Sequence, residues 1–69
     1  MEIKWEEGFK INVSVEGNTA TISANREGLL SLANHLMALV REEPGSHIHL
    51  DEHNSLEDSS AELIIERIE

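Results

Sequence analysis

Residues 25–43 read NREGLLSLANHLMALVREE, and this stretch decides the fold. When successive residues are placed 100° apart around a helix, its aliphatic side chains fall within about half of the helical wheel. These side chains are Leu29, Leu30, Leu32, Ala33, Leu36, Met37, Leu39 and Val40. Polar residues dominate the other half, so we expect His35 at the surface. The pattern predicts one amphipathic helix that packs through its leucine-rich side.

No other segment has a helical pattern, so the partner of this helix must be a β-sheet. Apolar and polar residues alternate from Phe9 to Val15, which is typical of a half-buried strand. Gly17-Asn18 predicts a tight hairpin turn, because either residue tolerates a positive φ. The return strand, residues 19–24, then directs its small or apolar residues inward, and these are Ala20, Ile22 and Ala24.

The helix has recognisable ends. Asn25 is a good N-cap, because its side chain can accept from the free N–H groups of the first turn. Pro44-Gly45 should end the helix at Glu43, because proline disfavours helical geometry at the residue before it.

Two more strands are expected after the helix. In residues 47–51 the apolar Ile48 and Leu50 share one face, and a polar loop with Leu56 as a buried anchor follows. The last strand, residues 62–68, is apolar on both faces: Leu63 and Ile65 can face the helix, while Ile64 and Ile68 project from the other side. The segment around Trp5 or another molecule would have to cover them, and a homodimer is one alternative.

These elements predict an α+β fold of order β-β-α-β-β. A single helix would pack on one face of a mainly antiparallel sheet of four to five strands, with residues 1–5 either extending the first strand or forming a fifth. At 69 residues the chain is expected to form one domain, residues 1–69, near the lower size limit for a self-sufficient core.

The net charge of −9, from 14 acidic and 5 basic residues, argues against a nucleic-acid-binding surface. It suits steering toward a basic protein partner, and it equally suits simple solubility. The chain has no cysteine, no leader pattern and no apolar run long enough to cross a membrane. We therefore expect a cytoplasmic protein with no membrane partner.

One histidine-rich segment is a candidate metal site. His47 and His49 are two residues apart on a predicted strand, so both rings can reach one zinc ion, with Asp51 or His53 as third ligand. The alternative is that these residues form the solvent side of a half-buried strand, and no cofactor is favoured. The sequence contains no nucleophile-and-base arrangement and no glycine-rich phosphate loop, so we do not expect an enzyme.

Three blocks resemble a known family. NREGLLSLA at residues 25–33, GSHIHLD at 45–51 and ELIIE at 62–66 are similar to the Immunity protein 32 family of bacterial polymorphic toxin systems. The resemblance implies a small α+β protein that binds and neutralises a cognate toxin without catalysis. From charge and expected exposure, and not from the family, we predict a partner-binding surface formed by His47, His49, Asp51, Glu52, His53, Glu57, Ile64 and Ile68. A metal-binding module and a self-associating structural domain remain the alternatives.

Overall fold

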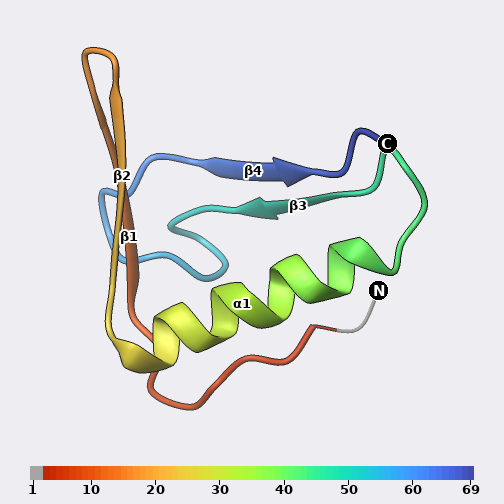
Figure 1. Ribbon diagram of the computed structural model, residues 1–69. Helices are drawn as coiled ribbons and strands as arrows, with labels where there is room; N and C mark the ends of the chain where they lie inside the picture. The colour runs from red at the N-terminus through yellow and green to blue at the C-terminus, as the bar shows by residue number, and fades with distance from the viewer. Residues whose placement is uncertain (1–2) are drawn as a thin grey trace.

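The computed structural model describes residues 3–69, and its elements follow the predicted β-β-α-β-β order (Figure 1). They are β1 (Ile11–Glu16), β2 (Thr19–Ala24), α1 (Arg26–Val40), β3 (His47–Leu50) and β4 (Leu63–Glu66). The α+β class is therefore confirmed. Met1, the start of the predicted extension or fifth strand, lies outside the described residues, and residues 3–5 belong to no strand.

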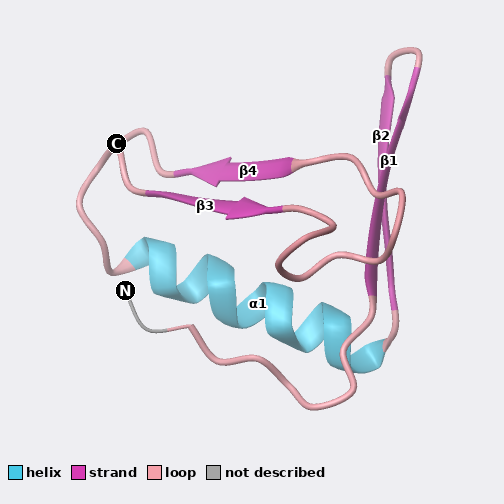
Figure 2. Ribbon diagram, turned by 180° about the vertical axis from the view of Figure 1, so that it is seen from behind, coloured by secondary structure: helices cyan, strands magenta, loops and turns pink. Residues whose placement is uncertain are grey.

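The predicted single sheet is wrong, because the strands of residues 3–69 form two separate antiparallel pairs, β1–β2 and β3–β4. The loop between β3 and β4 occupies the edge of β1 that a larger sheet would need. Glu57 donates its backbone N–H to the carbonyl of Ile11, and Ala61 donates to that of Val13, both at 2.8 Å. The β1–β2 hairpin consequently stands crosswise to β3 and β4 (Figure 2).

The hairpin turn is where the sequence predicts it. Gly17 has a φ of +58°, and β1 and β2 pair in register from Ile11–Ala24 to Glu16–Thr19. The apolar face of the hairpin is buried only at its base, since the outer half extends beyond the rest of the molecule (Figure 1). Ile22 lies opposite the buried Val13 and therefore projects from the same face, as predicted, but its side chain is 46% exposed.

The helix begins as predicted and ends earlier. The side chain of Asn25 accepts a hydrogen bond from the N–H of Gly28 at 2.7 Å, so Asn25 is the N-cap. The helix ends at Val40, three residues before Glu43. At this end the guanidinium of Arg67 donates to the carbonyl of Val40, at 3.2 Å, and to that of Glu42, two residues beyond the helix, and so satisfies backbone acceptors from outside it.

Arg67→Ala is expected to lower the free energy of unfolding by about 1–2 kcal/mol, because the carbonyls of Val40 and Glu42 both lose a charged donor. Urea denaturation followed by circular dichroism measures this change. Arg41→Ala is the matched control, because Arg41 is exposed and lies in the same helix end. Equal midpoints for the two variants would show that the contacts of Arg67 do not stabilise the helix end.

The orientation of α1 is the largest departure from the sequence pattern. Its buried residues are Gly28, Ser31, Leu32, His35, Ala38 and Leu39. His35 is 0% exposed, whereas Leu36 is 50% and Val40 63% exposed. The predictions that His35 lies at the surface and that most of the leucine-rich side packs inward are therefore wrong.

The N-terminal segment, residues 3–9, explains this orientation, because it runs along α1 and covers the polar side of the helix (Figure 1). Ser31 accepts a hydrogen bond from the backbone N–H of Glu6 at 2.8 Å. The ring of Trp5 packs edge-on against that of His35, with centroids 4.2 Å apart, and stacks on Phe9 at 4.4 Å. Polar helix residues are thus buried beneath a segment that the helical periodicity does not reveal.

The β3–β4 pair agrees with its prediction. Ile48 and Leu50 are buried and Leu63 and Ile65 pack against the core, while the opposite face is open to solvent. Leu56 is buried in the loop, as predicted. Within residues 3–69, no helix combines the length and the apolar character that crossing a membrane requires.

Candidate partner-binding surface

The outer face of β3–β4 combines histidines, carboxylates and one aliphatic side chain. The antiparallel register places His49 opposite Ile64 and His47 opposite Glu66, and directly opposed residues project to the same side. Glu62 completes the group, because its carboxylate lies 3.5 Å from Nδ1 of His49. We call these five residues, His47, His49, Glu62, Ile64 and Glu66, the histidine face.

The two imidazoles of the histidine face lie together. Their centroids are 4.8 Å apart and their planes nearly perpendicular, and Nδ1 of His47 lies 3.3 Å from the carbonyl oxygen of Gly45. The His49–Glu62 pair is about half exposed on both sides, so solvent weakens its attraction even when His49 is protonated. The face therefore presents adaptable polar groups around Ile64, and its ion pair has no strong structural role.

Hydrogen bonds hold the start of the loop after β3. The carboxylate of Asp51 accepts from the backbone N–H groups of His53, at 2.9 Å, and Asn54, at 3.1 Å. Asn54 in turn donates from its side chain to the carbonyl of His49 at 3.2 Å. Asp51 therefore shapes the connection between the histidine face and the loop.

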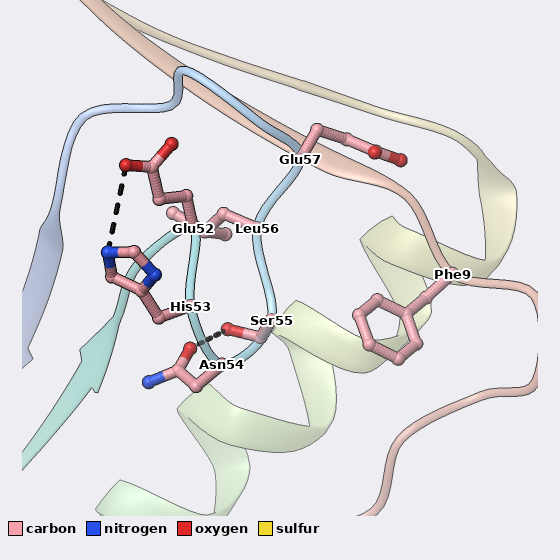
Figure 3. A pocket seen from close by; sticks show the side chains of 7 residues that line it. All are labelled: Phe9, Glu52, His53, Asn54, Ser55, Leu56 and Glu57. Atoms are coloured by element: carbon pink, nitrogen blue, oxygen red, sulfur yellow. Dashed lines mark hydrogen bonds and ion pairs between the residues drawn. The ribbon is translucent and has the colours of Figure 1, made fainter.

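Of the remaining predicted residues, Glu52 and His53 lie together in the loop, whereas Glu57 and Ile68 lie apart from them. Glu52 accepts from the backbone N–H of Ser59 at 2.8 Å and lies 3.8 Å from Nε2 of His53. Figure 3 shows both side chains on one side of a pocket of about 290 Å³, while Glu57 points away from them. Ile68 is exposed beyond the end of β4. The structure thus brings together His47, His49 and Ile64, places Glu52 and His53 in the adjoining loop, and separates Glu57.

Within residues 3–69, the candidate zinc site has no third ligand beside His47 and His49. In the described part of the chain, no three histidine, aspartate or glutamate residues are placed to hold one metal ion. The carboxylate of Asp51 is already engaged by backbone N–H groups, and the side chain of His53 pairs with Glu52 in the loop. The outward position of His47 and His49 is the one their strand alternation predicts.

The positions of two groups of residues were not predicted from the sequence. Glu62 and Glu66 join the histidine face because of the pairing register, which strand alternation alone does not reveal. His35 is buried with both ring nitrogens unpaired among residues 3–69, and burial lowers the pKa of its imidazole. Trp5 is a large aromatic residue that needs a packing partner, and this requirement is the signal that could have predicted the burial of His35.

The acidic charge is concentrated around this surface. Residues 51–69 contain seven acidic residues and one arginine, a net charge of −6, whereas residues 1–50 contain seven acidic and four basic residues, a net charge of −3. About two-thirds of the net charge thus lies in the loop, β4 and the residues after it. The negative field is therefore strongest at this end of the molecule.

Comparison with known proteins adds one family. The model described as Immunity protein 32 matches residues 19–68, a range that contains β2, α1, β3 and β4. No curated protein and no solved structure matches the chain. Because the match spans more than half of the sequence, and includes the three blocks that suggested the resemblance, the chain belongs to the Immunity protein 32 family.

Proposed function

We propose that this protein binds a cognate basic toxin and neutralises it by occupying its surface, without catalysis. The membership of the Immunity protein 32 family supports an immunity role. The main support for the proposed contact surface is the exposure of the histidine face on the side of β3–β4 away from α1. This face also adjoins the most acidic part of the chain.

The composition of the histidine face suits recognition of another protein. Interfaces usually combine a few apolar anchors with a polar rim, and the anchors account for most of the affinity. Ile64 is an exposed aliphatic side chain at the centre of this face, opposite His49 and two residues from both Glu62 and Glu66 along β4. In this proposal Ile64 enters an apolar recess of the toxin, and the carboxylates meet basic groups around it.

The loop extends the proposed contact. Glu52 and His53 lie in the loop that follows β3, three and four residues after His49, and Asp51 keeps the start of this loop in place. Glu57 and Ile68, also predicted from the sequence, would lie at the margins of the contact. A cytoplasmic location belongs to the same proposal, because the protein must be present where the toxin acts.

The proposal is tested with the toxin encoded next to this chain. Co-expression with the wild-type chain should restore growth, and the purified pair should form a complex. Ile64→Ala combined with His49→Ala should raise the dissociation constant by about 10- to 100-fold, the usual effect of truncating interface anchors. The affinity should also fall as salt is raised, because screening weakens the attraction between opposite charges.

Ile22→Ala combined with Val15→Ala is the matched control. It truncates two exposed aliphatic residues of the β1–β2 hairpin, neither of which belongs to the histidine face, and should leave the affinity unchanged. Equal affinities for both double variants would reject the histidine face as the contact. Failure of the wild-type chain to restore growth or to form a complex would reject the immunity role with this toxin.

A further inference from the structure

An uninterrupted apolar surface runs along the exposed side of α1. It consists of Leu29, Leu30, Ala33, Leu36, Met37 and Val40, which we call the α1 stripe. Leu29 is 56% and Met37 52% exposed, although the outward side of a surface helix is normally polar. From Leu29 to Val40 the stripe is about 17 Å long at 1.5 Å per residue.

The stripe continues toward β4. A groove of about 420 Å³ lies between α1 and β4, with Leu36, Leu39, Val40 and Ile65 as its apolar wall and Glu66, Arg67 and Glu69 at its polar side. Leu36 and Val40 belong to both the stripe and the groove wall. Contiguous exposed apolar surface of this kind is characteristic of interfaces.

We propose that a second copy of this chain covers the α1 stripe, with the two helices antiparallel about a two-fold axis. The stripe itself contains no charged residue, so two copies of a chain with a net charge of −9 can meet there without opposing carboxylates. A two-fold axis next to Ala33 also presents identical surfaces to each other, as a symmetric dimer requires.

The side chains of the stripe are complementary in this arrangement. When Leu29 lies opposite Val40 of the second copy, Ala33 lies opposite Leu36, so a small residue faces a large one at the centre. The same register directs the exposed Arg26 toward the C-terminal end of the second copy's α1, where the exposed Glu43 follows Val40 by three residues, and this approach occurs twice in the dimer. If the two α1 helices were parallel, Arg26 of one copy would instead lie near Arg26 of the other. Antiparallel helix dipoles favour the same orientation, because the positive end of one helix approaches the negative end of the other.

This dimer does not depend on the proposed toxin binding. His47, His49 and Ile64 project from the side of β3–β4 away from α1, so these residues stay accessible when the α1 stripes are joined, although Glu66 also borders the groove beside α1. The stripe also differs from Ile64 and Ile68, the residues whose exposure suggested self-association from the sequence.

The oligomeric state of the full chain tests the proposal. Light scattering behind a sizing column should give twice the 7.7 kDa mass of one chain at high concentration. Leu36→Glu combined with Val40→Glu should give the mass of a single chain, because four carboxylates would be buried in the interface. Ile64→Glu, on the outer face of β4, should leave the dimer intact. Circular dichroism establishes that each variant keeps its helix.

Charge reversal tests the antiparallel register. Arg26→Glu and Glu43→Arg should each weaken the dimer by about threefold to tenfold, since each change disrupts two symmetry-related exposed ion pairs. The double reversal should restore the wild-type dissociation constant. A wild-type chain with the mass of a monomer at roughly 1 mM, a concentration that detects even weak dimers, would overturn the proposal. A dimer that Ile64→Glu dissociates, or that the double reversal does not restore, would overturn it as well.

Discussion

Gly28→Ala is expected to destabilise the protein by about 2 kcal/mol, although alanine usually stabilises a helix by about 1 kcal/mol relative to glycine. A Cβ atom at this position would lie 2.4 Å from the carbonyl oxygen of Lys10 and 3.0 Å from side-chain atoms of Ala24 and Ile11. The carbonyl of Lys10 cannot rotate away freely, because it accepts the backbone N–H of Asn25 at 3.1 Å. The first turn of α1 would therefore have to move away from β1.

Urea denaturation of Gly28→Ala should show a lower midpoint, and the loss is large for a chain whose total stability is only a few kcal/mol. Gly17 offers a matched pair of controls, because its φ is +58° and its surroundings are open. Gly17→Ala should cost about 1 kcal/mol through backbone strain, and Gly17→Asn less, since asparagine tolerates this conformation. If Gly28→Ala instead stabilises the protein, the close packing of α1 on β1 is absent in solution.

The close approach at Gly28 also shows what a sequence pattern can and cannot predict. The N-cap at Asn25, the turn at Gly17 and the alternation in β3 depend on neighbouring residues, and all three were predicted correctly. The side of α1 that faces inward depends on contacts distant in the chain. It is set by residues 3–9, whose contacts include the hydrogen bond from Glu6 to Ser31.

The separation of the sheet into two hairpins has the same origin. Each strand pair is local, but the edge of β1 is taken by Glu57 and Ala61, about 45 residues further along the chain. A loop without strand character can supply such hydrogen bonds, because they require backbone groups and no particular side chains. No residue pattern within the loop indicates this pairing.

The candidate surface could be predicted in part for the same reason. The outward projection of His47 and His49 follows from alternation with the buried Ile48 and Leu50. The presence of Glu62 and Glu66 on the same face follows from the register in which β3 pairs with β4. The polar loop between the two strands sets this register, and its residues do not predict it. Whether these groups contact a partner stays a prediction.

His35→Phe is expected to stabilise the protein by about 1–2 kcal/mol near neutral pH. The imidazole is fully buried, and neither ring nitrogen has a hydrogen-bond partner in the described residues, so the folded state bears their desolvation cost. Phenylalanine removes this cost and keeps an aromatic ring against Trp5, whose centroid lies 4.2 Å from that of His35. Thermal or urea denaturation measures the difference, and His47→Phe is the control at an exposed position.

The same substitution should change how stability depends on pH. Burial lowers the pKa of His35 in the folded protein, whereas the unfolded chain titrates near the ordinary value of about 6.5. As the pH falls below this value, the unfolded state binds the proton first, so wild-type stability decreases until the lowered folded-state pKa is reached. Every other titratable group is common to both proteins, so the difference between wild type and His35→Phe isolates the imidazole of His35. A difference that stays constant from pH 7.5 to roughly 5 would mean that a hydrogen bond or solvent access offsets the burial of His35.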